Sequence, residues 1–347
     1  MAGSLRTIVC SIFVGIFLQR YSITIGLWRD KNLQKEKHFD GYNCHYLLEE
    51  YGAEDIATTS DGLAFITSGL GPYPPFIKNE APSAIYVMDL NVSPVRLTEV
   101  TIKSSQDLKL NPHGLDLFED GDKIYVFIVN HHQDLSVEAV EKFEYLIETN
   151  ELVWIKSFIN PDVLRSVNDV VAVGPDEFYC TNDFYSTHKT PIQRMIEQYS
   201  TLKLGSVAHC NEQKCELKTS YHIGMANGIT TRTIDGKTEV LVIYCYDDKI
   251  GVYEILENGD LTFTRTIASS PTMDNFWNAP DGSIYLAGND KMPLGSEVLR
   301  ILSNSDKMEQ VYFDDGAEFT MASIFVIWGE NILLGSPNHK FMACKKQ

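Results

Sequence analysis

A single alternation of polar and apolar positions recurs along the chain. Six times, a turn of Gly, Asp or Asn residues precedes four to six apolar β-forming residues, which small or polar residues follow. The copies are SDGLAFITSG from Ser60, GDKIYVFIVN from Gly121, GPDEFYCTND from Gly174, GKTEVLVIYCYD from Gly236, PDGSIYLAGND from Pro280 and GENILLGSPN from Gly329. Each copy predicts a buried strand that begins after a tight turn.

The spacing of these copies predicts the fold. They start 44 to 62 residues apart, and further strand-like runs, such as 84–90 and 249–255, fill the gaps. Units of several strands at such intervals are typical of propeller blades. The sequence therefore predicts an all-β chain whose residues 41–347 form a six-bladed β-propeller with a central tunnel. A large β-sandwich with similar turns by chance is the alternative.

Helical periodicity is sparse, and a few helices over one end of the propeller are expected. The clearest case follows Pro191, where apolar residues at 192, 195, 196, 199 and 202 would share one helical face. Such a helix would act as a lid, as a membrane-facing patch, or as a plain insertion packed on the core.

The N-terminus carries an apolar run over residues 7–18, preceded by Arg6. Twelve residues are too few to span a bilayer, for which roughly 20 are needed, so residues 1–40 are predicted to be a signal peptide or signal anchor with a linker. The protein is then secreted or lumenal in the secretory pathway. Because no clean cleavage site follows, a retained leader would associate the protein with a membrane or a lipid particle.

Charge and cysteine content narrow the function further. The net charge of −18 argues against nucleic acid as a partner and is compatible with a bound cation such as Ca²⁺, although solubility alone also explains it. Cys44 and Cys344 bracket nearly the whole propeller, whereas Cys210 and Cys215 flank a short polar turn suited to a hairpin disulfide. Asn91 begins one glycosylation sequon, which Pro94 follows directly.

A polar cluster lies six to nine residues upstream of five of the six repeat turns. The clusters are Glu54-Asp55, His113, Asn168-Asp169, Asn227 and Asp274-Asn275. At matching places on the innermost strand of each blade, these side chains would converge on the propeller axis. Carboxylate and amide oxygens are ligands that Ca²⁺ prefers, whereas transition metals favour histidine or thiolate. Acid–amide pairs are common in turns, so the shared phase is what indicates a calcium site.

At these residues the chain resembles the paraoxonase family of calcium-dependent lactonases and arylesterases. The matching blocks are GAEDIATTSDGLAFITSGL from Gly52, LNPHGLDLF from Leu110, VNH at 129–131, VNDVVAVGPDEFYCTND from Val167, ANGI from Ala226 and MDN at 273–275. The likeness extends to the N-terminal leader and the two outer cysteines. The resemblance implies hydrolysis of a small-molecule lactone or aryl ester.

The resemblance also implies roles for individual residues. A catalytic calcium is expected on one set of side chains, namely Glu54, Asn168, Asn227, Asp274 and Asn275. A second, structural calcium is expected on Asp55, Asp169 and the backbone carbonyl of Leu115. His113 matches the general base and His131 its hydrogen-bonded partner, with Asp274 as an alternative base. Cys44 and Cys344 match the disulfide that closes the propeller.

Two further hypotheses stay open beside the hydrolase. Some paraoxonase-like proteins act as membrane-tethered folding or assembly factors, and a retained leader would suit that function. A more distant calcium propeller, of the gluconolactonase kind, would have one calcium and no Cys44–Cys344 bridge. The chain also departs from many paraoxonases at Phe184, Tyr285, Gly288 and Asn289, so the substrate wall is expected to differ.

Overall fold

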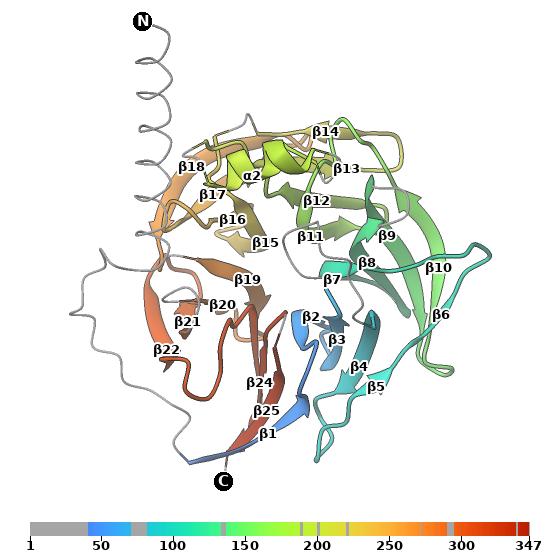
Figure 1. The fold of residues 1–347 in the computed structure, drawn as a ribbon, viewed down its shortest axis with the longest axis vertical. Coiled ribbons are helices and arrows are strands. Elements are labelled where there is room, and N and C mark those ends of the chain that lie inside the picture. The colour runs from blue at the N-terminus through green and yellow to red at the C-terminus, as the bar shows by residue number, and fades with distance from the viewer. Residues whose placement is uncertain are drawn as a thin grey trace, which may run out of the picture.

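The computed structural model describes residues 41–70, 82–132, 137–187, 190–199, 202–219, 222–270, 272–289, 295–337 and 339–346. These residues form six β-sheets that radiate from a common centre like blades (Figure 1). The predicted six-bladed propeller is confirmed. The predicted leader lies outside the described residues.

Each blade is an antiparallel sheet whose first strand lies nearest the axis, where it contacts the first strands of the two neighbouring blades. Blade 1 consists of β2 (Ala53–Thr58), β3 (Leu63–Ser68), β4 (Ala84–Asp89) and β5 (Thr98–Glu99). Blade 2 consists of β7 (Pro112–Asp120), β8 (Lys123–His132), β9 (Val137–Leu146) and β10 (Glu151–Phe158), with β6 (Thr101–Lys103) added in parallel at its outer edge. Blade 3 consists of β11 (Val167–Gly174), β12 (Glu177–Asn182), β13 (Ser206–Cys210) and β14 (Cys215–Leu217).

The remaining blades repeat this plan. Blade 4 consists of β15 (Ala226–Ile234), β16 (Lys237–Tyr244), β17 (Lys249–Ile255) and β18 (Leu261–Ala268). Blade 5 consists of β19 (Met273–Asn278), β20 (Ile284–Gly288), β21 (Ser296–Ile301) and β22 (Met308–Asp314). Blade 6 combines the C-terminal strands β23 (Ile324–Trp328), β24 (Asn331–Gly335) and β25 (Phe341–Lys346) with the first strand of the chain, β1 (Tyr42–Leu48).

Blade 6 closes the ring, because its outermost strand comes from the opposite end of the chain. Cys44 of β1 lies directly opposite Cys344 of β25, and the two form a disulfide. This bridge, implied by the family resemblance, is confirmed. It closes a loop of 300 residues, which on chain-entropy grounds stabilises the fold by about 5 kcal/mol. The gluconolactonase-type alternative expected no such bridge.

The hydrophobic core consists of the layers between adjacent blades. Strands that face a neighbouring blade on both sides are apolar throughout their middle, as in β8, where residues 126–129 are fully buried. Aromatic side chains contribute to these layers. One example is the stack of Trp277, Tyr285 and Phe325, with ring centroids 5.7 and 5.3 Å apart, which joins blade 5 to blade 6.

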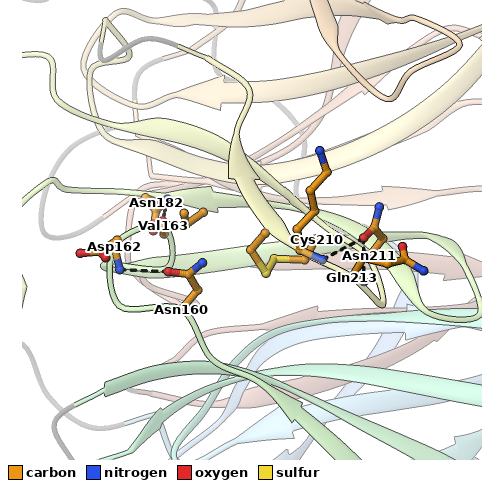
Figure 2. The surroundings of a disulfide bond; sticks show 9 residues. Asn160, Asp162, Val163, Asn182, Cys210, Asn211 and Gln213 are labelled. Carbon is orange, nitrogen blue, oxygen red and sulfur yellow. Dashed lines mark hydrogen bonds between the residues drawn. A yellow bond between two sulfur atoms is a disulfide. The ribbon is translucent and has the colours of Figure 1, made fainter.

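Blade 3 has a second disulfide at its outer strands and a polar loop that leads into its inner strand. Cys210 and Cys215 are bonded across the β13–β14 turn, as the sequence indicated, and Figure 2 shows this bridge with its neighbours. The same view shows Asn182, whose side-chain amide donates to the carbonyl of Val163 at 3.0 Å. Its Oδ1 accepts hydrogen bonds from the backbone of Arg165 and Ser166. Asn182 therefore positions the loop that leads into the inner strand β11.

The described residues contain one helix, α2 (Pro191–Tyr199), which packs over blades 3 and 4. Its inner face carries Arg194, which is fully buried and pairs with Asp183 at 3.3 Å. Its outer face exposes the apolar residues Ile192, Met195 and Ile196. No helix in the described ranges is long and apolar enough to cross a membrane.

Candidate active site and metal centre

Five of the six inner strands contain a β-bulge at the same place. Between two paired positions, the inner strand has two intervening residues where its partner strand has one, so one residue is extra. The bulged dipeptides are Glu54-Asp55, His113-Gly114, Asn168-Asp169, Asn227-Gly228 and Asp274-Asn275. A bulge re-aims its side chains out of the normal alternation. The polar clusters found in the sequence are therefore the bulges of the inner strands.

Four of these side chains have a buried oxygen without a hydrogen-bond partner. The atoms are Glu54 Oε2, Asn168 Oδ1, Asn227 Oδ1 and Asn275 Oδ1. Leaving a buried acceptor unpaired costs about 1 to 3 kcal/mol, so such atoms are rare in native folds. They come from four different blades and are all hard oxygen donors. This donor set fits a hard cation such as Ca²⁺ at the axis.

Glu54 connects several members of this group. Its Oε1 accepts a hydrogen bond from Asn275 Nδ2 at 2.8 Å and lies 3.5 Å from His113 Nε2. Its backbone carbonyl accepts from Ser323 Oγ of the segment leading into β23 at 2.7 Å. Residues of blades 2 and 5 thus meet around one buried carboxylate of blade 1, whose backbone is bonded to the segment that leads into blade 6.

The carboxylates at the axis raise one another's proton affinity. Burial, followed by the charges of Asp55 and Asp274, holds the pKa of Glu54 well above its usual range. Burial also raises the pKa of Asp274 to about 7, against the opposing hydrogen bond from Asn227. Buried carboxylates with these shifts need either protons or a cation nearby.

The composition of the group argues against a transition metal. Transition metals favour imidazole or thiolate ligands. In the described ranges, no three His, Cys, Asp or Glu side chains gather as a cluster that could hold a metal of any kind on those side chains alone. The axial group is instead made of separated carboxylates with amides between them. This mixture is compatible with calcium, which accepts amide and backbone oxygens.

The second residue of each bulge contacts the adjacent blade. Asp55 Oδ2 accepts a hydrogen bond from the backbone N–H of Leu115 in blade 2 at 2.9 Å. Asp169 Oδ2 accepts from the N–H of Ile229 in blade 4 at 2.8 Å. The other oxygens of these two carboxylates accept from the N–H of the residue that follows each of them.

These two carboxylates are also electrostatically coupled. Burial raises the pKa of Asp55 to about 7. Burial raises the pKa of Asp169 well above its usual range, and the charge of Asp55 raises it further. The structure thus brings together Asp55, Asp169 and the backbone of Leu115, the three residues expected to hold the second calcium.

In blades 2 and 4, the second bulge position is glycine because neighbouring blades approach closely there. A Cβ on Gly114 would lie 2.2 Å from Asp169 Oδ1, and one on Gly228 would lie 2.3 Å from the carbonyl oxygen of Asp274. Distances under 3 Å are impossible without backbone movement. These glycines let the bulges of adjacent blades pack against one another.

His113 and His131 form a direct hydrogen bond. His113 Nδ1 and His131 Nε2 are 2.9 Å apart, and both rings are buried. The other nitrogen of His131, Nδ1, lies 2.5 Å from Glu138 Oε2. The other nitrogen of His113, Nε2, is the one that faces Glu54. The pair therefore leads from a buried carboxylate in blade 2 to the axial group.

Sequence reasoning missed three residues of this region. Ser323 lies six residues before Gly329, the same phase as the other clusters. The predicted pattern consists of carboxylates, amides and one histidine, and serine is none of these. Asp116 follows Leu115 and accepts from the N–H of Ala172 at 2.8 Å, and burial raises its pKa to about 7. Glu138 lies on the neighbouring strand β9, outside every repeat motif.

Two of the positions that differ from many paraoxonases serve packing. Tyr285 is buried in the aromatic stack between blades 5 and 6, which is core and not substrate wall. Phe184 is buried beneath the Arg194 guanidinium, with 4.6 Å between the guanidinium carbon and the ring centroid.

Close packing explains a third difference, at Gly288. A Cβ there would lie 2.5 Å from the Cα of Met273, so this position has no room for a larger residue. The fourth, Asn289, is buried, and its Oδ1 has no hydrogen-bond partner. Of the four positions that differ, Asn289 is thus the one with an unsatisfied side-chain oxygen.

The amide of Asn91, the predicted glycosylation position, is engaged between blades. Its Nδ2 donates to the carbonyl of Asp61 at 2.6 Å, and its Oδ1 accepts from Trp328 Nε1 at 3.1 Å. Nδ2 also donates to Asp89 Oδ1 at 3.2 Å, so a glycan, which replaces one of the two N–H hydrogens, would displace one of these two contacts. Glycosylation of Asn91 stays a prediction.

Fold and site together define a propeller with an oxygen-lined axis and an adjoining histidine pair. A family model described as arylesterase matches residues 37–346. The chain belongs to this arylesterase family, the family of the serum paraoxonases.

Among curated proteins, the chain is similar to several members of this family. It is 34% identical to human serum paraoxonase/lactonase 3 over 322 residues, covering 87% of this chain and 88% of the relative. Chicken serum paraoxonase/arylesterase 2 is 32% identical over 324 residues with the same coverage, and mouse serum paraoxonase/arylesterase 1 is 33% identical over 323 residues, also with the same coverage.

Solved structures with a similar fold have little sequence in common with this chain. A gluconolactonase of Xanthomonas campestris has a TM-score of 0.53 at 10% identity and covers 88% of this chain and 90% of its own. A putative gluconolactonase has a TM-score of 0.52 at 12% identity, covering 89% and 93%. These likenesses support the propeller fold alone.

Proposed function

We propose that the protein is a calcium-dependent hydrolase of lactones and aryl esters. One observation carries the proposal: four inner strands each direct a buried, unpartnered oxygen from the same bulge. Four such atoms are costly in a fold without a ligand and useful in a fold that binds a cation. Membership of the arylesterase family, and relatives named as lactonases and arylesterases, support the reaction class.

Two calcium ions are proposed. The first would be held by the axial side chains Glu54, Asn168, Asn227, Asp274 and Asn275. The second would be held by Asp55, Asp169 and the carbonyl of Leu115. When bound, the first Ca²⁺ supplies a Lewis acid that polarises the ester carbonyl and stabilises the negative charge developing on its oxygen.

His113 is proposed as the general base that removes a proton from the attacking water. Its Nε2 faces the axial group, and its Nδ1 is held by His131. A histidine in this position suits proton transfer near neutral pH. Asp274 is the alternative base, since burial raises the pKa of Asp274 to about 7.

The proposal is tested with the purified full chain and three probes: an aryl acetate, a lipophilic lactone and a phosphotriester. Hydrolysis of the aryl acetate or the lactone should require calcium and stop when a chelator is added. Asn168→Ala and Asp274→Ala should each lower kcat/KM by about 100-fold, the usual share of a group acting in the transition state. Asn258→Ala, at an exposed turn remote from the axis, is the matched control and should leave kcat/KM unchanged.

Two outcomes would reject the proposal. Hydrolysis that survives the chelator would remove calcium from the reaction. A calcium-loaded protein that hydrolyses neither the aryl acetate nor the lactone would instead favour a folding or assembly factor. In that case, deletion of residues 1–40 should abolish the biological phenotype whereas His113→Gln should not.

We also propose that the protein works in the secretory pathway or outside the cell. Disulfides persist in oxidising compartments, and the described residues contain two. The N-terminal apolar run would direct the chain there. Protease protection of the full chain in sealed microsomes tests this location, and an accessible, reduced chain in the cytosol would contradict it.

A further inference from the structure

A third buried side chain continues the histidine pair on the side remote from the axis. Glu138 lies directly opposite His131 in the β8–β9 ladder, and its Oε2 is 2.5 Å from His131 Nδ1. The three side chains Glu138, His131 and His113 are each at most 6% exposed. They form a row of two hydrogen bonds inside blade 2, and His113 Nε2 at the end of this row lies 3.5 Å from Glu54 Oε1 of blade 1.

The chemistry of the end group sets the direction of every hydrogen bond in this row. An ionised carboxylate only accepts, so Glu138 requires a proton on His131 Nδ1. In the neutral ring, His131 Nε2 is then an acceptor, and His113 Nδ1 must donate to it. With Glu138 ionised and both rings neutral, the proton of His113 would lie on Nδ1, and its Nε2 would carry the free electron pair that faces the axial group.

Without Glu138, nothing else in the row would select this arrangement. Two hydrogen-bonded imidazoles have two equivalent proton arrangements, and in the reversed one His113 Nε2 carries the proton. The charges near His131 include those of Glu138 and of the Asp183–Arg194 pair beneath α2. The charges near His113 include the carboxylate of Glu54. Of these groups, Glu138 is the one that accepts from His131 Nδ1.

We propose that Glu138 is a positioning residue which, through His131, keeps the Nε2 of His113 unprotonated and directed at the reacting water. This inference rests on the proposed function of His113 as general base. When His113 Nε2 takes the water proton, the ring becomes a cation with a proton on each nitrogen. His131 and Glu138 then stabilise that charge through the same two hydrogen bonds, and no second proton transfer is needed.

A neighbouring glutamate on the same strand has a different role and provides a matched control. Glu141 is fully buried, and its carboxylate accepts from Asn130, Trp154 and Ser157 and contacts His132 Nε2 at 2.8 Å. These partners hold β8, β9 and β10 together. Glu141 thus pairs with a histidine, as Glu138 does, but it is not part of the row that ends at His113.

The test uses the full chain as wild type, Glu138→Gln, Glu138→Asp and Glu141→Gln. Nitrogen-15 NMR of labelled histidine reports which ring nitrogen of His131 and His113 carries the proton, with His131→Gln and His113→Gln used for assignment. In the wild type, both rings should be protonated on Nδ1. Glutamine both donates and accepts, so Glu138→Gln should give a mixture of tautomers, whereas Glu138→Asp and Glu141→Gln should keep the wild-type pattern.

Kinetics with an aryl acetate provide the second measurement. Glu138→Gln should lower kcat by about 100-fold with KM within twofold, because the base and not substrate binding is affected. Glu138→Asp should recover at least a tenth of the wild-type kcat, and Glu141→Gln should stay within threefold of it.

The inference is overturned if Glu138→Gln retains the wild-type tautomers and kcat, or if Glu141→Gln loses kcat to the same extent. A wild type that hydrolyses no ester would refute the proposed function alone. The NMR measurement would then still decide whether Glu138 sets the proton positions.

Discussion

The two residues of each bulge have opposite properties, although they are neighbours in sequence. The first residues include Glu54, Asn168 and Asn227, each with a buried oxygen that has no partner. The second residues either bond the next blade, as Asp55 and Asp169 do, or are glycines. Asn275 has both properties, a bond to a neighbouring blade and an unpartnered oxygen, since its Nδ2 donates to Glu54 while its Oδ1 has no partner.

This difference separates assembly from ligand binding within one structural feature. The second position joins blade to blade, and the carboxylates of Asp55 and Asp169 there accept backbone hydrogen bonds in addition to the second calcium that they are proposed to hold. The first position leaves acceptors unsatisfied, which a cation at the axis would satisfy. Substitutions at the two positions should therefore differ in how their effects depend on calcium.

The largest effect is expected at a second-position glycine. Gly228→Ala should lower the free energy of unfolding by about 3 kcal/mol or more, because its Cβ would meet backbone atoms of blade 5 at 2.3 Å. Urea denaturation in excess calcium measures this. The control is Gly236→Ala in an open turn with φ of +77°, where only the left-handed backbone costs about 1 kcal/mol. Equal losses in the two variants would contradict the proposed close packing.

The second-largest change in stability is expected when an amide at the first bulge position is replaced. At a calcium concentration 100-fold above its Kd, each bound ion stabilises the wild type by about 2.7 kcal/mol, and Asn168→Leu should lose that gain for the axial ion. In chelator, the same variant should be at least as stable as the wild type, because an unpaired buried oxygen is gone.

Asn182→Leu is the matched control for this measurement. It removes an amide whose oxygen accepts two backbone hydrogen bonds, so it should destabilise the protein equally with and without calcium. If Asn168→Leu behaves like Asn182→Leu, the first position is structural and the comparison fails.

A smaller effect concerns pH in the metal-free protein. Burial raises the pKa of Asp116 to about 7. Between pH 4 and 7 the folded state therefore holds a proton that the unfolded state releases. The contribution of Asp116 to the free energy of unfolding is therefore fully present below pH 4 and is lost as the pH rises through 7.

The measurement is the free energy of unfolding in chelator at pH 5 and pH 8. The wild type should lose about 2.5 kcal/mol more than Asp116→Asn over this range, since the folded pKa of about 7 lies about two units above pH 5 and one pKa unit corresponds to about 1.4 kcal/mol. An identical pH dependence in the two proteins would show that Asp116 ionises freely in the fold.

The smallest effect is expected far from the axis. Arg232 and Arg265 of blade 4 share Asp306 of blade 5 and Glu239, and these pairs are partly exposed. Asp306→Ala should cost about 0.5 to 1 kcal/mol at low salt and less at 1 M salt. A larger loss that is insensitive to salt would mean that this network, and not the axis, joins blades 4 and 5.

Much of the fold was predictable because turns and buried strands recur at regular intervals. The repeat indicated six blades, and the phase of Glu54, Asn168, Asn227 and Asp274 placed them on the inner strands. The bulges themselves were not predictable, because a bulge is defined by register with a partner strand. Sequence periodicity alone does not carry that register.

The residues that sequence reasoning missed have physical reasons in common. Glu138 acts across the β8–β9 ladder, so its relation to His131 depends on strand pairing and not on a motif. The resemblance to the paraoxonase family led to the expectation that Tyr285 lines the substrate wall, but successive strand residues face opposite sides, and it belongs to the core.

The central claim is that the first bulge residues of several blades hold one divalent ion at the axis. Equilibrium dialysis with radioactive calcium, on full-length protein freed of metal, tests it directly. The wild type should bind two ions per chain, and the double variant Glu54→Gln/Asn168→Leu should bind one. A double variant that binds calcium as the wild type does, or a wild type that binds none, would contradict the account.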